Sequence, residues 1–405
     1  KYLWCVPAQT TNYIPDISLY DHAKTTACIA LCLFDQYEAG DLTQADFQEM
    51  DNSKKEQFIL ISGDVSGIQD FIFNIPSKGA AKSLKGHSVY LSLLSDVLTR
   101  FLIRELNLKE VNVLYNGGGN FYILAPKSKE EKFLALKREI SKLLLNIHSG
   151  SIYVALDYIS LCPADFKRFN VQWKRVGDKI DNQKRKKWSE IGLKENYSFL
   201  FGPFSSGSKE KEHCRLCGIE KEKRKIKYDP ESEISRCSFC ASFEKLTNSI
   251  KKADCLVVKE SKGHIDKIEV YQDAFRLFGY EYNFCSAKEM STNDFKQAYL
   301  LNDTNFLQKT YQGYRLGALK LPLKNEGTGL TFKEIAEGSQ GDAKLALLKL
   351  DIDNLGYLFS DGFGKNATIS RVTSLSRMLG LYFEGYINHL IAENQWENYL
   401  YVVFS

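Results

Sequence analysis

Residues 345–359 read LALLKLDIDNLGYLF, and the rest of the chain can be interpreted from this stretch. An apolar run of strand type ends in two carboxylates, Asp351 and Asp353, and residues 354–356 then turn the chain. Alternation along a strand points both carboxylates to the same side. Two carboxylates at that spacing suit Mg²⁺ or Mn²⁺ held together with substrate phosphates. A polar turn after a buried strand is the simpler interpretation of an isolated Asp-x-Asp-Asn.

A second stretch repeats this pattern and weakens the simpler interpretation. Residues 58–73 read FILISGDVSGIQDFIF, where Asp64 ends an apolar run as Asp351 does and Ser66 stands where Asp353 stands. In each copy a helix-length segment follows, and then a strand. The two helical segments are residues 88–106 and 369–391.

The first copy continues as a complete folding unit. Its strand at residues 111–115 enters the glycine-rich turn 116–120 and returns as residues 121–125, which predicts a β-hairpin. An amphipathic helix at residues 129–147 and a strand at 151–160 close the unit. Strand, helix and hairpin in this order indicate a palm, a ferredoxin-like half-barrel in which an acidic strand tip and a hairpin tip together hold metal and nucleotide.

In the second copy, residues 399–404 form the matching strand. The predicted fold class is therefore α+β, with two ferredoxin-like palms of the nucleotidyl cyclase type. We expect nucleotide contacts from Asp64, Ser66, Asn354 and Gly356. Because a second carboxylate is missing at Ser66, the first copy is expected to bind nucleotide or shape the pocket without performing chemistry.

Four cysteines between the two copies predict a structural zinc site. Cys214-x₂-Cys217 is followed after nineteen residues by Cys237-x₂-Cys240, a spacing typical of two zinc knuckles. Two disulfides or free thiols are the alternative, and neither suits a reducing compartment. The metal is expected to hold together a module too small to keep a core of its own.

Composition indicates a globular chain of two to four domains. Its 405 residues are 44% hydrophobic and 26% charged, and the net charge of +4 is too small to argue for nucleic acid by itself. No apolar run reaches the 18 residues of a membrane span, so we expect a cytoplasmic protein without membrane contact. The basic, aromatic residues 167–187 suit either nucleic acid or a solvated helix face. Residues 77–86 suit either a phosphate cradle or a plain loop.

The first forty residues predict a helix from Leu19 onward. Asp21 and His22 form a possible metal pair there, although one such pair on a helix is more often a cap or a solvated turn.

Several motifs together resemble the large signature subunit of type III CRISPR effector complexes of the Csm kind. They are SGDVSGIQDFIF at 62–73, the four-cysteine insert, DIDNLG at 351–356 and SRVTSLSRMLGLYFEGYINHL at 370–390. In that family two palms face each other, and the second carries a Gly-Gly-Asp-Asp hairpin that works with the strand-tip aspartate to make cyclic oligoadenylate from ATP. The resemblance covers nearly the whole sequence, which ends one residue before that hairpin motif is expected.

The resemblance implies Asp351 and Asp353 as catalytic metal ligands, a structural Zn²⁺, catalytic Mg²⁺ or Mn²⁺, and ATP as substrate. It further implies single-stranded DNA cleavage by an HD domain, and as partners a guide crRNA, a target RNA and sister subunits. We expect these 405 residues alone to be inactive. The implied organisation is the end of an HD domain with a connector at 1–56, a degenerate first palm at 57–166, a basic linker and zinc module at 167–250, a mixed region at 251–340 and the start of the catalytic palm at 341–405.

Two other functions remain open from the residues. The chain could be a scaffold that binds RNA and sister subunits without catalysis, or an enzyme like a diguanylate cyclase. A scaffold has no need of two carboxylates at metal spacing on one strand tip. A diguanylate cyclase would not need a second palm or a zinc insert.

Overall fold

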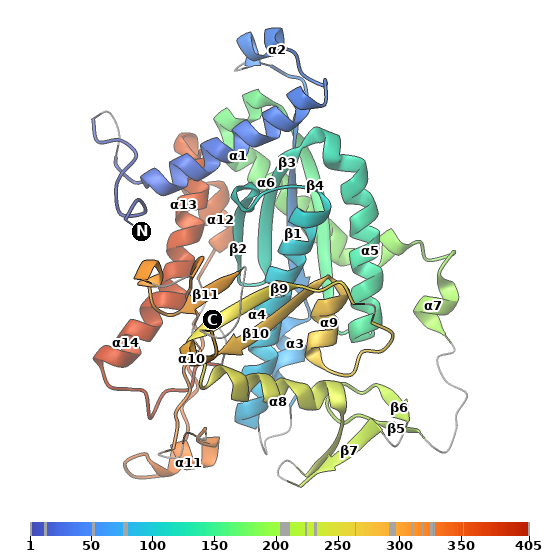
Figure 1. The fold of residues 1–405 in the computed structure, drawn as a ribbon, viewed down its shortest axis with the longest axis vertical. Helices are drawn as coiled ribbons and strands as arrows, with labels where there is room; N and C mark the ends of the chain where they lie inside the picture. Colours follow the sequence, from blue (N-terminus) through green and yellow to red (C-terminus); the bar gives the residue numbers. More distant parts are fainter. Residues whose placement is uncertain are drawn as a thin grey trace.

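The computed structural model describes most of the chain, and Figure 1 shows its arrangement. The described residues are 2–11, 14–50, 53–75, 80–202, 211–222, 225–230, 233–263, 265–290, 297–308, 311–317, 319–324, 327, 329–350 and 352–403. They form a mixed α and β structure with two four-stranded sheets. Among the helices described, none combines the length and the apolar character that crossing a membrane requires.

The first sheet confirms the element order predicted for the first copy. Its strands follow one another in the spatial order β2-β3-β1-β4 with antiparallel neighbours, and two helices connect them in the βαββαβ order of a ferredoxin-like unit. The elements are β1 Phe58–Ser66, α4 Ala80–Glu105, β2 Val113–Gly117, β3 Asn120–Pro126, α5 Glu130–His148 and β4 Tyr153–Leu161.

Both faces of this sheet are buried, because side chains of β1 alternate between two hydrophobic cores. Ile59, Ile61 and Val65 pack with α4 and α5 in one core. Phe58 and Leu60 face the opposite core, which is covered by four helices (Figure 1). These helices are α1 Leu19–Glu38, α6 Phe169–Arg185, α12 Leu355–Ser360 and α13 Ile369–Gly380.

Helix α4 begins earlier than the sequence pattern predicted. Residues 80–86 form its first turns and all but Lys82 are buried, so neither a phosphate cradle nor a solvated loop lies there. Residues 77–79 fall outside the described part. Gly86 explains the close packing, since a Cβ there would lie 2.0 Å from the carbonyl oxygen of Phe243 on the neighbouring helix. That neighbour is α8 Ser238–Ile250, which lies along α4.

The second sheet packs beside α4 and α8 (Figure 1). Its order is β10-β9-β11-β12, with β9 Cys255–Glu260, β10 Tyr280–Cys285, β11 Ala298–Leu301 and β12 Gly313–Arg315. Residues 267–270 form no strand and lead directly into a helix. The Asp273 carboxylate accepts hydrogen bonds from the backbone N–H groups of Glu269 and Val270, both at 2.9 Å, and so starts helix α9 Tyr271–Leu277.

Shorter elements connect these sheets. They are α2 Gln44–Gln48, α3 Ile68–Phe73, α7 Tyr197–Phe201, α10 Ala287–Met290 and α11 Phe332–Glu337, together with the two-stranded ribbons β5 Lys211–His213 with β6 Glu220–Glu222 and β7 Ile226–Asp229 with β8 Ile234–Cys237.

The second copy differs from its prediction. Its helix is confirmed as α13, a π-helical turn Leu381–Tyr386 and α14 Ile387–Glu393. Residues 343–350 and the described residues 399–403 form no strand. A strand needs a neighbour for its backbone hydrogen bonds, and no strand among the described residues pairs with either segment. The apolar side chains of the first segment are exposed, with Leu347 at 89%.

Candidate metal centre and palm sites

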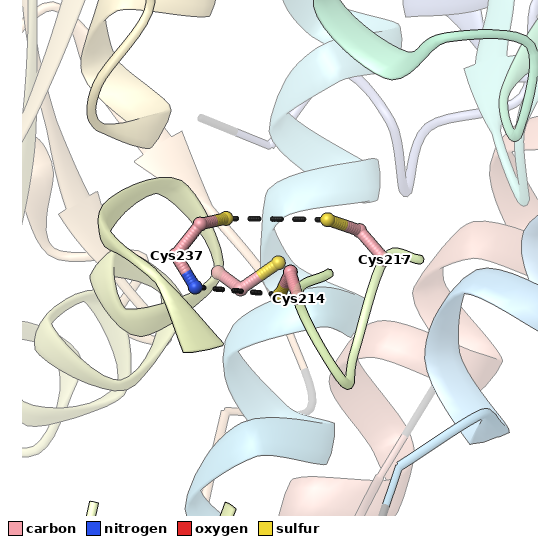
Figure 2. A group of neighbouring side chains, drawn as sticks. Cys214, Cys217 and Cys237 are labelled. Carbon is pink, nitrogen blue, oxygen red and sulfur yellow. Dashed lines mark hydrogen bonds between the residues drawn. The ribbon is translucent and has the colours of Figure 1, made fainter. Parts of the chain in front are cut away.

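The four cysteines come together at the junction of the small ribbons and helix α8, and Figure 2 shows Cys214, Cys217 and Cys237 of this group. Cys214 and Cys217 lie in the turn between β5 and β6, and Cys237 and Cys240 lie at the start of α8. Their four sulfur atoms are all within 4.8 Å of one another, and among the described residues no other group of three or more possible ligands does the same. The spacing in the sequence therefore predicted a cluster that the fold brings together.

The geometry of the cluster fits zinc. Tetrahedral zinc with Zn–S bonds of about 2.3 Å separates its sulfurs by about 3.8 Å, and the Sγ atoms of Cys217 and Cys237 are 3.9 Å apart (Figure 2). Hydrogen bonds from the neighbouring thiols, that of Cys217 first, lower the pKa of Cys214, and the same contacts raise the pKa values of Cys217 and Cys240. A bound divalent cation would stabilise all four thiolates together.

The backbone shapes each knuckle. The N–H of Gly218 donates to the carbonyl of Cys214 at 2.9 Å, and Gly218 takes a left-handed φ of 70° that closes the turn. Cys237 is the N-cap residue of α8, and its N–H donates to the Cys214 sulfur at 3.3 Å. A helix N-terminus favours thiolates, because the helix dipole is positive there.

The second knuckle is also fixed to the first palm. Phe243, Leu246 and Ile250 of α8 belong to the hydrophobic core that includes α4. The Thr247 hydroxyl donates to the carbonyl of Lys82 on α4 at 2.6 Å. Helix α8 is therefore held by apolar packing as well as by the cysteine cluster.

At the first palm, Asp64 lies where the repeat placed it, near the end of the central strand β1. Its carboxylate forms an ion pair with Lys184 of α6, and its side chain is 18% exposed. Burial raises the pKa of Asp64, which the Lys184 hydrogen bond and charge only partly offset. In a palm that holds a metal, the carboxylate at this strand end faces a cation. Here the Lys184 ammonium group takes the place of that cation.

Ser66 is the last residue of β1 and pairs with Tyr153 of β4. The hairpin tip is next to Asp64, because Asn120 of β3 is its register partner on the other side. The described part of this tip therefore combines Asp64, the Asn120 amide and Lys184, whose ammonium also lies 3.7 Å from a carboxylate oxygen of Asp181 on α6. This set lacks the carboxylates that two divalent ions require.

The predicted catalytic residues of the second copy are less constrained. Asp351 lies outside the described residues. Asp353 and Gly356 are exposed, and Asn354 is the N-cap residue of α12 with a left-handed φ of 55°. Asp353 belongs to no group of three possible ligands in the described ranges.

Asp21, predicted as one half of a metal pair near the N-terminus, lies in a buried ion pair instead. Its buried carboxylate accepts hydrogen bonds from Ser18, Ser374 and Arg377, with the Arg377 Nη2 at 2.7 Å. Burial alone would raise the pKa of Asp21, but the hydrogen bonds from Arg377, Ser18 and Ser374 together have the larger effect and lower its pKa. His22 is exposed beside it. Asp21 therefore joins α1 to α13, and its carboxylate is paired with the Arg377 guanidinium rather than with His22.

A buried charge cluster between α4 and the second sheet was missed at the sequence level. The Asp96 carboxylate accepts hydrogen bonds from Arg100 Nε at 2.9 Å and Tyr282 Oη at 2.5 Å, and Arg315 Nη1 lies 3.3 Å away. Burial alone would raise the pKa of Asp96, but the charges of Arg315 and Arg100 hold it well below its usual range. No local pattern marks this cluster, since its members are up to 219 residues apart.

Comparison with known families gives two matches along the chain. Residues 57–203 match the family described as Csm1 subunit domain B. Residues 344–405 match the family described as Cas10/Cmr2, second palm domain.

Curated relatives carry the description CRISPR system single-strand-specific deoxyribonuclease Cas10/Csm1 (subtype III-A). One from Methanocaldococcus jannaschii is 35% identical over 98% of this chain and 56% of its own length. One from Mycobacterium tuberculosis is 28% identical over 96% of this chain and 49% of its own length. The chain therefore spans about half the length of the curated relatives it matches.

Solved structures share the fold. The apo Csm1–Csm4 cassette has a TM-score of 0.69 at 22% identity and covers 98% of this chain and 47% of its own. The Csm1–Csm4 cassette in complex with cA4 has a TM-score of 0.67 at 21% identity, again over 98% and 47%.

Proposed function

This chain belongs to the Cas10/Csm1 family, and on that premise we propose that the protein synthesises cyclic oligoadenylate from ATP as the large subunit of a type III-A CRISPR effector. In this proposal the chemistry takes place at the second palm, and target RNA bound to the assembled complex activates it. The matched solved structures include cassettes described as complexes with ATP and with cA4, which supports adenine nucleotides as the ligand class.

The observation that carries the assignment is the state of the first palm. Asp64 there pairs with Lys184 and lies opposite Asn120, and the face of the sheet that would be open in a working palm is covered by α1, α6, α12 and α13. Chemistry is therefore assigned to the second copy, whose Asp351 and Asp353 keep the carboxylate spacing. The first palm then acts as the scaffold on which the second is built.

At the second palm, Asp351 and Asp353 would hold Mg²⁺ or Mn²⁺, which supplies charge neutralisation of the triphosphate and activation of a ribose hydroxyl. Asn354 and Gly356 would lie beside the nucleotide, because they turn the chain directly after the two carboxylates. Asp64 and Ser66 would border the same pocket from the first palm without binding a metal.

Zinc is proposed for the cysteine cluster, with a structural function. Four sulfurs leave no open position for water on a tetrahedral ion, so this centre does not activate a nucleophile. It fixes β5–β8 at the start of α8, which packs on α4 of the first palm.

The remaining activity and partners are proposals for the intact protein. We propose single-stranded DNA cleavage, following the description of the relatives, and assign it to the HD domain that the sequence resemblance implies. The partners are a guide crRNA, a target RNA and sister subunits, among them one like the Csm4 present in the matched structures.

The test uses the assembled complex with the full-length subunit. Asp351→Asn and Asp353→Asn should each reduce cyclic oligoadenylate synthesis by at least about a hundredfold, since the amide keeps the shape and loses the charge that holds the cation. Asp361→Asn is the matched control. Asp361 is an exposed aspartate ten residues after Asp351, and among the described side chains it forms a hydrogen bond only with Ser360.

Asp64→Asn should keep synthesis within a few-fold of the wild type, since the first palm carries no metal in this proposal. Guide-RNA binding, measured in parallel, should be unchanged in all four variants. Full synthesis by Asp351→Asn would exclude the strand-tip assignment. Retained RNA binding without any synthesis by the wild type would favour the scaffold function instead.

A further inference from the structure

Two cysteines outside the zinc cluster lie directly opposite each other across the second sheet. Cys255 opens β9, Cys285 ends β10, and the two residues are register partners in this antiparallel pair. Their Sγ atoms are 3.0 Å apart, and the Cys255 thiol also donates toward the Cys285 carbonyl at 3.3 Å. Both are free thiols.

The backbone geometry of this pair meets the requirements of a disulfide. Directly opposed residues of antiparallel strands have Cα atoms about 4.5–5.5 Å apart, within the range of about 4.4–6.8 Å that disulfides span. An S–S bond is about 2 Å long, so the sulfurs need to approach by about 1 Å from their present separation. Side-chain rotation alone supplies such a movement.

The surroundings distinguish the two thiols. Cys255 is fully buried with Val257, Ala298 and Tyr311, whereas Cys285 is partly exposed at the edge of this small core. In the described ranges neither thiol belongs to a group of three or more possible metal ligands. The pair is therefore separate from the zinc cluster, and only one of its members is open to a reagent.

We propose that Cys255 and Cys285 form a reversible, redox-sensitive disulfide that closes across β9 and β10. The oxidant is a low-molecular-weight disulfide. The Cys285 thiolate attacks one of its sulfurs and releases the first small thiol, and the Cys255 thiolate then attacks the mixed disulfide at Cys285 and releases the second. The protein pair loses two protons and two electrons, and the reagent is reduced to two thiols.

Slow reaction is expected at neutral pH. Burial raises the pKa of both thiols, and the Asp254 and Glu289 charges raise them further. The thiolate is the nucleophile, so the pair closes slowly near neutral pH and faster as the pH rises.

Closure would stiffen the sheet that joins the two palms. β9 lies between β10 and β11, and β11 pairs with β12, whose Arg315 reaches Asp96 on α4 of the first palm. The crosslink also encloses residues 256–284, which include α9. The disulfide would thus make the second sheet more rigid where the second half of the chain contacts the first palm.

The test equilibrates the intact, zinc-loaded protein with mixtures of reduced and oxidised glutathione, then alkylates free thiols and maps peptides by mass spectrometry. We expect a Cys255–Cys285 crosslink at least tenfold more abundant than any Cys28–Cys32 crosslink. Cys28 and Cys32, which are both fully buried, are the internal control for background crosslinking. They lie one turn apart on α1, where Cβ atoms are about 5–6 Å apart, beyond the disulfide range of about 3.5–4.5 Å.

Three outcomes would overturn the proposal. They are full alkylation of both cysteines at every glutathione ratio, a glutathione adduct on Cys285 that never resolves, and a crosslink that survives reduction by excess glutathione. Cys285→Ser should abolish the crosslinked peptide and leave zinc content unchanged. Because the main measurement uses the wild-type protein, it does not depend on the folding of any variant.

Discussion

Strand β1 and residues 345–350 are the corresponding segments of the two copies, and they have opposite environments. β1 is hydrogen-bonded to β3 and β4 along its length, and Leu60 in its centre is fully buried. Residues 345–350 pair with no described strand, and Leu347 is 89% exposed. Two segments with similar apolar patterns are thus buried or exposed according to whether other strands lie beside them. A neighbouring strand supplies hydrogen-bond partners for the backbone and packing partners for the apolar side chains.

The acidic tips of the two segments differ in the same way. Asp64 is largely buried and its charge is neutralised by Lys184. Asp353 is exposed, and among the described residues it belongs to no group of three or more possible metal ligands. A tip that is already neutralised is suited to hold a scaffold together. An open tip remains available to a cation.

The largest expected effect comes from truncating the same residue type in both segments. Leu60→Ala should lower the free energy of unfolding by about 2–5 kcal/mol, because it leaves a cavity between two packed layers. Leu347→Ala should change it by no more than about 0.5 kcal/mol. Urea unfolding with hydrogen exchange of β1 to β4 measures both, and equal effects would mean that the two segments share one environment.

Acidic pH should destabilise the first palm through its buried histidines. Burial lowers the pKa of His148 to about 3 and of His87 to about 4. Unfolded histidine binds a proton near pH 6.5, so stability is complete above that pH and is lost as the pH falls toward 4. At pH 5 the loss should be about 2 kcal/mol per histidine.

His148→Gln should reduce the slope of stability against pH over this range. His389→Gln is the control from the second copy, since the His389 side chain is 66% exposed and is solvated in both states. A slope that His148→Gln leaves unaltered would place the acid sensitivity elsewhere.

Removing the cation at the first tip should have a smaller effect. Lys184→Met leaves the Asp64 carboxylate partly buried without its ion pair, and should lower the free energy of unfolding by about 1–2 kcal/mol at pH 7. The loss should shrink at pH 5, because burial raises the pKa of Asp64 and lets the folded protein bind a proton there.

Lys186→Met, two residues along and exposed, is the matched control and should have no effect. Chemical denaturation at the two pH values tests the prediction. An effect independent of pH would mean that Lys184 acts through packing rather than charge.

The smallest effect on the palm itself is expected from metal loss. Cys237→Ser should abolish zinc binding and speed hydrogen exchange in β5 to β8, while exchange in β1 to β4 stays unchanged. The reason is that α8 is held on α4 by Phe243, Leu246 and Ile250 independently of the metal. Metal analysis and exchange mass spectrometry measure both, and rapid exchange in β1 would show that zinc supports the palm core.

The sequence by itself determined features with a local physical cause. The apolar run of β1, the glycine-rich hairpin and the amphipathic α5 follow from side-chain pattern and turn chemistry. The Cys-x₂-Cys spacing determined the cysteine cluster, because each tight turn presents two sulfurs to one point.

Only the tertiary structure decided how charges and apolar segments are partnered. Lys184 neutralises Asp64, Arg377 occupies Asp21, and Arg315 joins Asp96 across 219 residues. An ion pair of this kind has no periodicity to reveal it, since it depends on which helix face meets which strand. For the same reason residues 345–350 carry the pattern of a strand without forming one, because a strand is completed by a neighbour and not by its own sequence.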